Sequence, residues 1–409
     1  MSEVKFIDNG SVTSTPGFKA CGVTAGLKKS GNPDMALVAS DVPANFAGVF
    51  TSCVFAAAPV RVCRKLVRSC ATAKAFIINS GNANACTGAA GMANAEKMSE
   101  LTANALQITD SAVLVASTGR IGVQMPMDII EKGIKMAAGT LSCDGGNQAA
   151  RAIMTTDTVP KACAVSVEIA GKTVTIGAIC KGVGMIDPQM TTAPHATMIC
   201  CITTDAICSN ALLEKMLADN ANNSFNRITV DGDMSTNDTC VIFANGVSGV
   251  DLDANADDAA KFQTALLALM QNLARKQVMD GEGATKFVAI EIDGAPDNAA
   301  AKLCAEAVAN SLLCKTAWFG CDPNWGRIVA ALGYSGADFD PDKVDIFYDD
   351  MIVVRQGGDA GTPEADLARI LQNREFTVKV HMNQGAGEYW VWTSDVSYEY
   401  VKINAEYHT

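Results

Sequence analysis

The sequence predicts an α/β protein of two or three structural units. The chain has 409 residues, of which 49% are hydrophobic and 19% charged, so it can bury a large core. In the first half, short β-like runs alternate with segments of helical periodicity, and the tail after Lys343 is rich in strand patterns. These observations favour a mixed α/β fold with a smaller β-rich unit at its C-terminal end.

The first half contains both periodicities. The segments 95–108 and 127–141 have apolar residues at helical spacing, and the second begins directly after Pro126, a favourable first-turn position. Alternation of polar and apolar residues predicts a β-hairpin over 161–180. Apolar runs of strand length lie at 35–40, 47–52, 73–80 and 112–118.

The second half repeats this alternation and then becomes strand-rich. Helical patterns lie at 209–220, where Ser209 can cap the first turn, and at 260–279. A strand is expected at 286–292, and a smaller strand-rich unit is expected over about 340–409. The runs that predict this unit are 343–354, 375–382 and 388–403.

The charge balance points to a small-molecule substrate. The formal net charge is −12 and the pI is about 4.8. Nucleic acids and anionic membrane surfaces reward clustered Lys and Arg, so neither is expected as the main partner. No run of eighteen uninterrupted apolar residues occurs, and no membrane-spanning helix is expected.

The fifteen cysteines do not indicate a disulfide framework, because that pattern belongs to short secreted chains. The opening "MSEVKFIDNG" has no apolar signal segment, so we expect reduced thiols and a cytoplasmic location. The cysteines form no C-x-x-C pair and the three histidines lie far apart in sequence, so no metal site is expected. The adjacent Cys200 and Cys201 are expected to alternate between the faces of a buried strand.

Two acidic segments call for separate interpretations. "DLDANADDAAKF", from Asp251, resembles the start of a calcium loop, but Ala256 replaces the required glycine, so a solvated helix start is the better interpretation. "DGDMSTNDT", from Asp231 to Thr239, is rich in small polar groups. It is either a tight turn held by side-chain hydrogen bonds or a loop that shapes a site.

Two glycine-containing turns follow apolar strands. They are "NSGNANACTG", from Asn79 to Gly88, and "STGRIG", from Ser117 to Gly122, and neither matches a phosphate loop. A Ser-Thr-Gly turn is most often only a turn. The functional alternative is an oxyanion hole, in which Thr118 and the backbone N–H of Gly119 donate to a developing negative charge.

Thr197 becomes chemically significant if the peptide bond before it is broken. A threonine hydroxyl is a poor nucleophile, but an N-terminal threonine carries its own base, because its freed α-amine can take the hydroxyl proton. The same hydroxyl can first attack the carbonyl of Ala196, whose small side chain leaves that carbonyl open. Spacing and composition do not by themselves establish this chemistry.

Long motifs along nearly the whole chain resemble the ornithine acetyltransferase family, bifunctional glutamate N-acetyltransferases of arginine biosynthesis. The resemblance implies self-cleavage between Ala196 and Thr197 into chains 1–196 and 197–409, which fold together and stay associated. It also implies a layered α-β-β-α sandwich like that of self-processing aminopeptidases, and a heterotetramer of two α and two β chains. The motifs are "GVTAGLKKSG", "NSGNANACTG", "VASTGRIG", "AIMTTDTVPK", "KGVGMIDPQM", "ATMICCITTDA", "SFNRITVDGDMSTNDT", "DGEGATK", "KTAWFGCDPNWGR" and "YVKINAEYHT".

The resemblance also implies a set of site residues. Thr197 is the nucleophile, and Thr118 with Gly119 are the oxyanion donors. N-acetylornithine gives its acetyl group to Thr197 and glutamate then accepts it, with no metal or redox cofactor and with acetyl-CoA as a possible further donor. Besides Thr197, the substrate-binding positions are Thr155, Lys181, Glu282, Asn404 and Thr409; an ammonium on Lys181 suits an α-carboxylate and Glu282 suits an ammonium.

One departure from the family affects the nucleophile. The family runs from G-M-I-x-P-x-M directly into A-T-M, whereas here "TTAPH", Thr191 to His195, stands between them. The upstream register points to Thr192 and the downstream register to Thr197, and the small residue before Thr197 favours the latter. The alternatives in function are a self-processing aminopeptidase or amidase, and an uncleaved amino-acid-binding protein.

Overall fold

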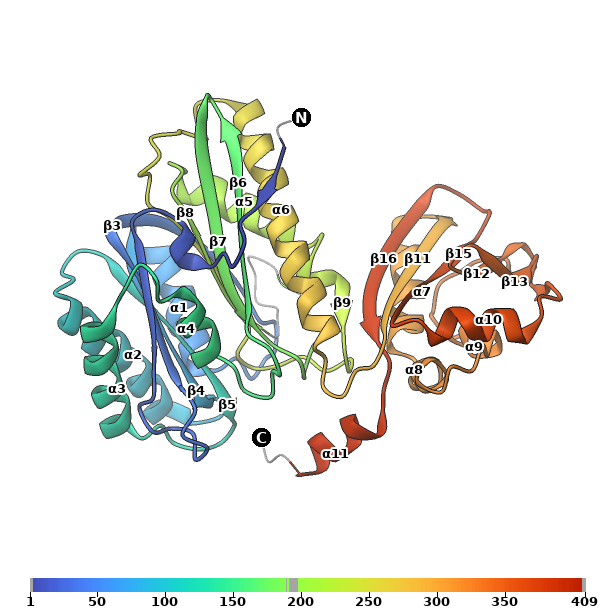
Figure 1. Ribbon diagram of the computed structural model, residues 1–409, viewed down its shortest axis with the longest axis horizontal. Coiled ribbons are helices and arrows are strands. Elements are labelled where there is room, and N and C mark those ends of the chain that lie inside the picture. The colour runs from blue at the N-terminus through green and yellow to red at the C-terminus, as the bar shows by residue number, and fades with distance from the viewer. Residues whose placement is uncertain (1–2, 189, 191–197, 407–409) are drawn as a thin grey trace. The chain divides into compact units, whose positions relative to one another are not determined.

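The computed structural model describes residues 3–188, 190 and 198–406 and confirms the predicted α/β class (Figure 1). Its contacts divide the chain into two compact units. Of the described residues, the first comprises those up to Asn226 together with Met234–Gln277, and the second comprises Arg227–Asp233 together with residues 278–406. The predicted boundary between residues 196 and 197 lies outside the described residues.

The first unit contains a mixed sheet of nine strands among the described residues, in the order β1-β6-β7-β8-β10-β3-β4-β5, with β2 paired to β3. In Figure 1, α2 and α3 lie on one side of its strands and α6 on the other. Its elements are β1 (Lys5–Phe6), η1 (Val12–Ser14), β2 (Phe18–Val23), β3 (Met35–Phe50), α1 (Ala58–Ser69), β4 (Ala73–Asn82), α2 (Gly88–Leu106), β5 (Ala112–Arg120), α3 (Met127–Thr140), α4 (Gly146–Ala152), β6 (Lys161–Ile169), β7 (Lys172–Lys181), β8 (Ile199–Thr204), α5 (Asn210–Ala221), β10 (Thr239–Ala244) and α6 (Ala256–Met279).

Strand β3 joins two parts of this sheet. Its first part pairs with β2 and β4, and its last part, from Asn45 to Phe50, pairs with β10. The runs predicted at 35–40 and 47–52 therefore belong to one long strand. The predicted hairpin is confirmed as β6 and β7, and its turn residues Ala170 and Gly171 both have positive φ, as a two-residue hairpin turn requires.

The central strands are apolar on both faces. Every residue of β8 is buried, and Cys200 and Cys201 lie within it as predicted. β8 pairs antiparallel with β7 and parallel with β10, so both of its edges are hydrogen-bonded. None of the fifteen cysteines, all within the described chain, forms a disulfide.

Two predicted helix starts are confirmed. The Ser209 hydroxyl accepts a hydrogen bond from the Leu212 N–H at the start of α5. The Asn255 side chain accepts from the N–H groups of Asp257 and Asp258, so the acidic run after Asp251 leads into α6.

The second unit contains a mixed sheet of seven strands within the described chain, in the order β14-β13-β12-β15-β11-β16-β9. Helix α7 packs on β11 and β16, and the core beneath it includes Trp318 and Tyr348. Its elements, with η2 (Phe225–Arg227) at the start, are β9 (Ile228–Thr229), β11 (Phe287–Ala295), α7 (Asn298–Asn310), α8 (Leu312–Phe319), α9 (Trp325–Gly333), η3 (Pro341–Lys343), β12 (Asp345–Tyr348), β13 (Met351–Arg355), β14 (Gly358–Asp359), α10 (Glu364–Gln372), β15 (Glu375–His381), β16 (Gly387–Ser394) and α11 (Tyr398–Glu406).

The tail differs from the prediction in two respects. The strand-rich unit begins well before residue 340, because β11 pairs with both β15 and β16 and carries α7–α9 with it. The strand predicted over 388–403 ends at Ser394, and the chain then forms helix α11. The Ser397 hydroxyl accepts from the Glu399 N–H, and Glu399 pairs with Lys402 one turn along, so local polar contacts favour the helix.

In the described part of the chain, no helix combines the length and apolar character that crossing a membrane requires.

Candidate active site

The oxyanion pair expected from sequence lies at the end of β5, where Thr118 and Gly119 are half-buried. β5 runs parallel to β4, and Gly119 pairs with Gly81. Gly119 has a φ of +125°, and a Cβ placed on it would lie 2.5 Å from the Gly81 carbonyl carbon. Only glycine therefore fits at residue 119, because it lets the backbones of β4 and β5 approach closely at the strand end.

Lys181 brings two further predicted residues to this point. It is the last residue of β7, only 8% exposed, and its Nζ donates to Thr155 Oγ1 at 2.7 Å and to Thr118 Oγ1 at 3.5 Å. Thr155 lies in the loop between α4 and β6. Three predicted site residues that are far apart in sequence thus meet around one ammonium group.

Sequence reasoning missed Asp157, which anchors this cluster. Its buried carboxylate accepts from Lys161 Nζ at 2.7 Å, from the Gly182 N–H at 2.9 Å and from the Thr155 N–H at 3.1 Å. Lys181 Nζ lies 3.9 Å away. Burial on its own raises the pKa of Asp157, but the two lysine charges and the Gly182 N–H outweigh it and lower the pKa to about 2. In the sequence, the available signal for this contact was the spacing of Asp157 and Lys161, which stand four residues apart within "TTDTVPK".

Lys28 is a second residue that sequence reasoning missed. Its Nζ donates to the carbonyls of Pro33 and Met154, both at 2.7 Å, and Met154 directly precedes Thr155. Burial lowers the pKa of Lys28 to about 8; the Lys181 charge also lowers it, and Asp34 opposes the change. The site therefore holds two cations, which suits an anionic group of a substrate.

Asp238 is a buried acid near the same strand ends. It is 2% exposed, and its Oδ2 makes no hydrogen bond within the described chain. Burial raises its pKa well above the ordinary value, and the Lys181 charge opposes this only in part. The next residue, Thr239, donates its N–H to the Met198 carbonyl at 2.6 Å. Asp238 therefore lies where β10 meets the start of β8.

Two more predicted residues meet within the second unit. Asn404 on α11 donates its side-chain amide to Glu282 Oε2 at 2.9 Å. Burial raises the pKa of Tyr400, and the negative charges of Asp231, Asp233 and Glu282 raise it further. This acidic environment favours a cation such as an ammonium group.

The predicted nucleophile Thr197, its neighbour Ala196, the alternative Thr192 and the C-terminal Thr409 lie outside the described residues. β8 begins two residues after position 197. Across residues 3–188, 190 and 198–406, no three His, Cys, Asp or Glu side chains are grouped so as to hold a metal ion.

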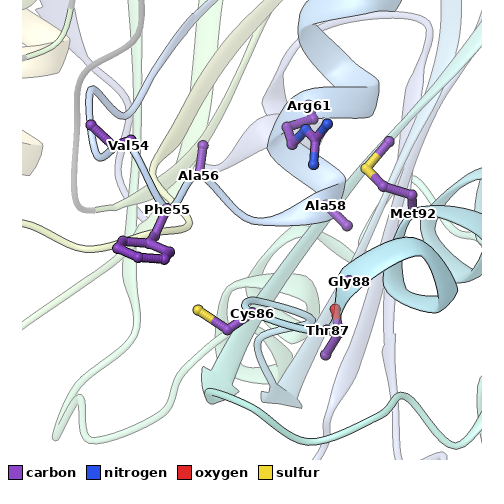
Figure 2. A pocket seen from close by; sticks show the side chains of 9 residues that line it. All are labelled: Val54, Phe55, Ala56, Ala58, Arg61, Cys86, Thr87, Gly88 and Met92. Carbon is purple, nitrogen blue, oxygen red and sulfur yellow. The ribbon is translucent and has the colours of Figure 1, made fainter.

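A separate small hollow of about 170 Å³ lies beside the N-terminal end of α2 (Figure 2). Figure 2 shows that the loop before α1, the first turn of α1 and the start of α2 form its walls. It contains none of the predicted site residues, so it is distinct from the Lys181 cluster. The lining residues are Val54, Phe55, Ala56, Ala58, Arg61, Cys86, Thr87, Gly88 and Met92.

The fold and the Lys181 cluster define an α/β protein whose strand ends bring together hydroxyl groups, a glycine backbone and cations, an arrangement that suits stabilisation of an oxyanion. The chain belongs to the ArgJ family, which matches residues 19–409.

Named relatives agree with this assignment. The arginine biosynthesis bifunctional protein ArgJ of Symbiobacterium thermophilum is 46% identical over 98% of this chain and 99% of its own. The glutamate N-acetyltransferase of Methanocaldococcus jannaschii is 44% identical over the same shares. A solved ornithine acetyltransferase from Mycobacterium tuberculosis, complexed with ornithine, is 38% identical over 46% of this chain and 100% of its own, with a TM-score of 0.42.

Proposed function

We propose that this chain transfers an acetyl group from N-acetylornithine to glutamate through an acetyl ester on Thr197, after cutting itself between Ala196 and Thr197. Membership of the ArgJ family makes it an acyltransferase of arginine biosynthesis. The observation that carries the proposal is the meeting of Thr118, Thr155 and the Lys181 ammonium at the ends of β5 and β7.

Self-cleavage uses the Thr197 hydroxyl first. Its oxygen attacks the Ala196 carbonyl, the C–N bond breaks, and the hydroxyl proton passes to the released amine. Water then hydrolyses the ester and frees an N-terminal threonine. The freed α-amine, with an ordinary pKa of about 8, is the base that activates the same hydroxyl for acetyl transfer.

Acetyl transfer then proceeds in two halves. In the first half, the Thr197 hydroxyl attacks the acetyl carbonyl of N-acetylornithine, the amide C–N bond breaks, and ornithine leaves with the hydroxyl proton. In the second half, the amine of glutamate attacks the ester carbonyl, the ester C–O bond breaks, and the Thr197 oxygen takes up the amine proton as N-acetylglutamate leaves. Thr118 and the Gly119 N–H donate to the oxyanion in both halves, and losing one such donor slows acyl transfer by about 100- to 1000-fold.

Different residues bind the negatively and the positively charged groups of the substrate. Lys181 binds the α-carboxylate, since its ammonium is held in place by Thr155 and Asp157. Glu282 and Asn404 bind the side-chain ammonium of ornithine, with Thr409 as a further contact. We also propose a cytoplasmic heterotetramer of two α and two β chains, which needs no cofactor and accepts acetyl-CoA as an optional donor.

The test is product analysis with purified protein, N-acetylornithine and glutamate. The proposal predicts ornithine and N-acetylglutamate in equal amounts. Release of free acetate instead identifies an amidase that passes the acyl group to water. A protein that stays as one intact chain on a denaturing gel and forms neither product identifies an uncleaved amino-acid-binding protein.

A further inference from the structure

The segment "TNDT", residues 236–239, makes buried contacts that the proposed mechanism does not use. Asn237 is 6% exposed, and its side chain donates both of its amide hydrogens to backbone carbonyls. One goes to Ser117 O at 2.7 Å and the other to Ala83 O at 2.6 Å. Ser117 directly precedes the oxyanion pair, so Asn237 contacts the backbone that must be positioned for catalysis.

These two hydrogen bonds complete a closed ring around the oxyanion pair. The chain runs from Ser117 through Thr118 and Gly119 to Arg120, whose carbonyl accepts the Ala83 N–H at 3.0 Å. The Ala83 carbonyl in turn accepts from Asn237, which also holds Ser117. Because each peptide unit is planar, fixing the Ser117 carbonyl also fixes the direction of the Thr118 N–H.

Asn237 is itself held firmly. The side-chain Oδ1 of Asn237 accepts from the Thr236 hydroxyl at 2.5 Å, and the backbone N–H of Asn237 donates to Ser235 Oγ at 3.1 Å. On the other side of the ring, the Ser117 hydroxyl donates to Asn79 Oδ1 at 2.7 Å. The ring therefore belongs to a buried network whose amide groups are hydrogen-bonded, and such networks are rigid.

The same segment reaches the strand that follows the nucleophile. Two residues after Asn237, the Thr239 N–H donates to Met198 O at 2.6 Å, and Thr239 pairs with Ile199 in the parallel ladder of β10 and β8. Met198 is covalently next to Thr197. Residues 237–239 thus connect the oxyanion pair on β5 to the chain segment that carries the nucleophile.

We propose that Asn237 is a positioning residue that holds Thr118 and Gly119 at a fixed place relative to β8, the strand that follows Thr197 in sequence. This inference rests on the proposed function. Of the two interpretations of "DGDMSTNDT", it favours a loop that shapes a site. Misplacing reacting groups by about 1 Å slows a reaction by about 100-fold, so small shifts of this ring matter.

The test compares Asn237→Asp with Asn220→Asp. Asn220 is a matched control in α5: it is 2% exposed and its side-chain amide also donates to a backbone carbonyl, that of Gln263. Both variants lose a buried amide donor, but only Asn237→Asp loses the hydrogen bonds to the Ala83 and Ser117 carbonyls that close the ring. Hydrogen exchange of residues 117–120 and transfer kinetics, expressed per cleaved molecule, are measured for both.

We expect Asn237→Asp to speed exchange at residues 117–120 and to lower kcat by about 100-fold, with KM nearly unchanged. A protonated aspartate can donate one hydrogen, so the activity of this variant relative to the wild type should rise as the pH falls, and by more than that of Asn220→Asp at the same pH. Asn220→Asp should change neither exchange nor kcat. If Asn237→Asp folds poorly, Asn237→Ser retains one donor and should lie between it and the wild type.

Unchanged exchange at residues 117–120 in the Asn237 variants overturns the inference, and so does an equal loss of kcat in Asn220→Asp. Failure of the proposed function looks different, since the wild-type protein then transfers no acetyl group. In that case hydrogen exchange still decides whether Asn237 holds the segment.

Discussion

Lys181 sets the electrostatics of the candidate site. Its ammonium contacts Thr155 and Thr118, pairs with Asp157, and influences the pKa values of Lys28 and Asp238. One side chain at the end of β7 therefore acts on four segments of the chain. Its replacement should affect binding more than folding, because its ammonium is the group proposed to meet the substrate carboxylate.

Lys181→Met tests that role. It removes a charged donor, and a charged hydrogen bond contributes about 1.5–3 kcal/mol, so ornithine should bind at least about tenfold more weakly in a calorimetric titration. Lys172→Met is the control, since Lys172 is exposed at the opposite end of β7. Equal affinity of Lys181→Met and the wild type would remove Lys181 from the substrate site.

Asp157 should make stability depend on acid pH. Its pKa is about 2 in the folded chain against an ordinary 3.8, so the unfolded state binds more protons between these values. The stabilisation, about 2 kcal/mol, is present above pH 4 and is lost as the pH falls towards 2. Urea unfolding of Asp157→Asn should show a deficit against the wild type that shrinks as the pH falls from 4 towards 2. A deficit that is constant over this range would contradict the assigned pKa.

The contribution of Asp238 to stability should change with pH in the opposite direction. Its raised pKa means that the folded state holds a proton that the unfolded state releases, so this residue destabilises the fold increasingly as the pH rises above about 4. Asp238→Asn removes this penalty and should gain stability relative to the wild type between pH 4 and pH 8, measured by urea unfolding. A difference that does not change with pH would show that Asp238 is ionised in the fold.

At the scale of elements, the parallel pair β4 and β5 depends on close backbone approach at Gly81 and Gly119. The pairing also lets the carbonyl of Arg120, the last residue of β5, accept from the Ala83 N–H, which belongs to the hydrogen-bonded ring that Asn237 closes. Any side chain at residue 119 must push the two strands apart.

Gly119→Ala should therefore destabilise the protein by about 2 kcal/mol or more and abolish activity. Gly122→Ala is the matched control: Gly122 also has a positive φ, +77°, but nothing lies within 4 Å of the point that a Cβ would occupy there. Thermal unfolding should show a clearly larger loss for Gly119→Ala. Similar losses for both variants would mean that backbone strain, rather than contact with Gly81, is the dominant effect.

Local patterns predicted most of the elements. The hairpin β6–β7, the strands β4 and β5, and the helices α3 and α5 follow from periodicity, which is a property of short segments. Helix α11 was missed because "SYEYVKI" alternates like a strand, while its helix is favoured by Ser397 and by the Glu399–Lys402 pair.

The site was predictable only in part. The resemblance to a family supplied Thr118, Thr155 and Lys181, and the structure shows how they come together. Asp157, Lys28 and Asn237 act through contacts between strands and loops that are distant in sequence, so no periodicity reveals them. Their identification required the sheet order and register.

At the scale of the whole molecule, the two compact units do not coincide with the two chains expected from cleavage. The first unit extends past residue 197 and includes β8, β10 and α6. Residues before and after the proposed cleavage position therefore both contribute strands to one sheet, since β7 and β10 flank β8. Separation of the halves would break that sheet, which supports the expectation that they stay associated after cleavage.

The most direct measurement is the mass of each fragment after mixing the protein with N-acetylornithine alone. The account predicts fragments of 196 and 409 − 196 = 213 residues, with one acetyl group on the larger fragment, attached at Thr197 and removed when glutamate is added. Thr197→Ala should give one intact chain without an acetyl group. A wild-type protein that transfers acetyl groups without ever carrying one on Thr197, or a Thr197→Ala variant that still transfers them, would contradict the account.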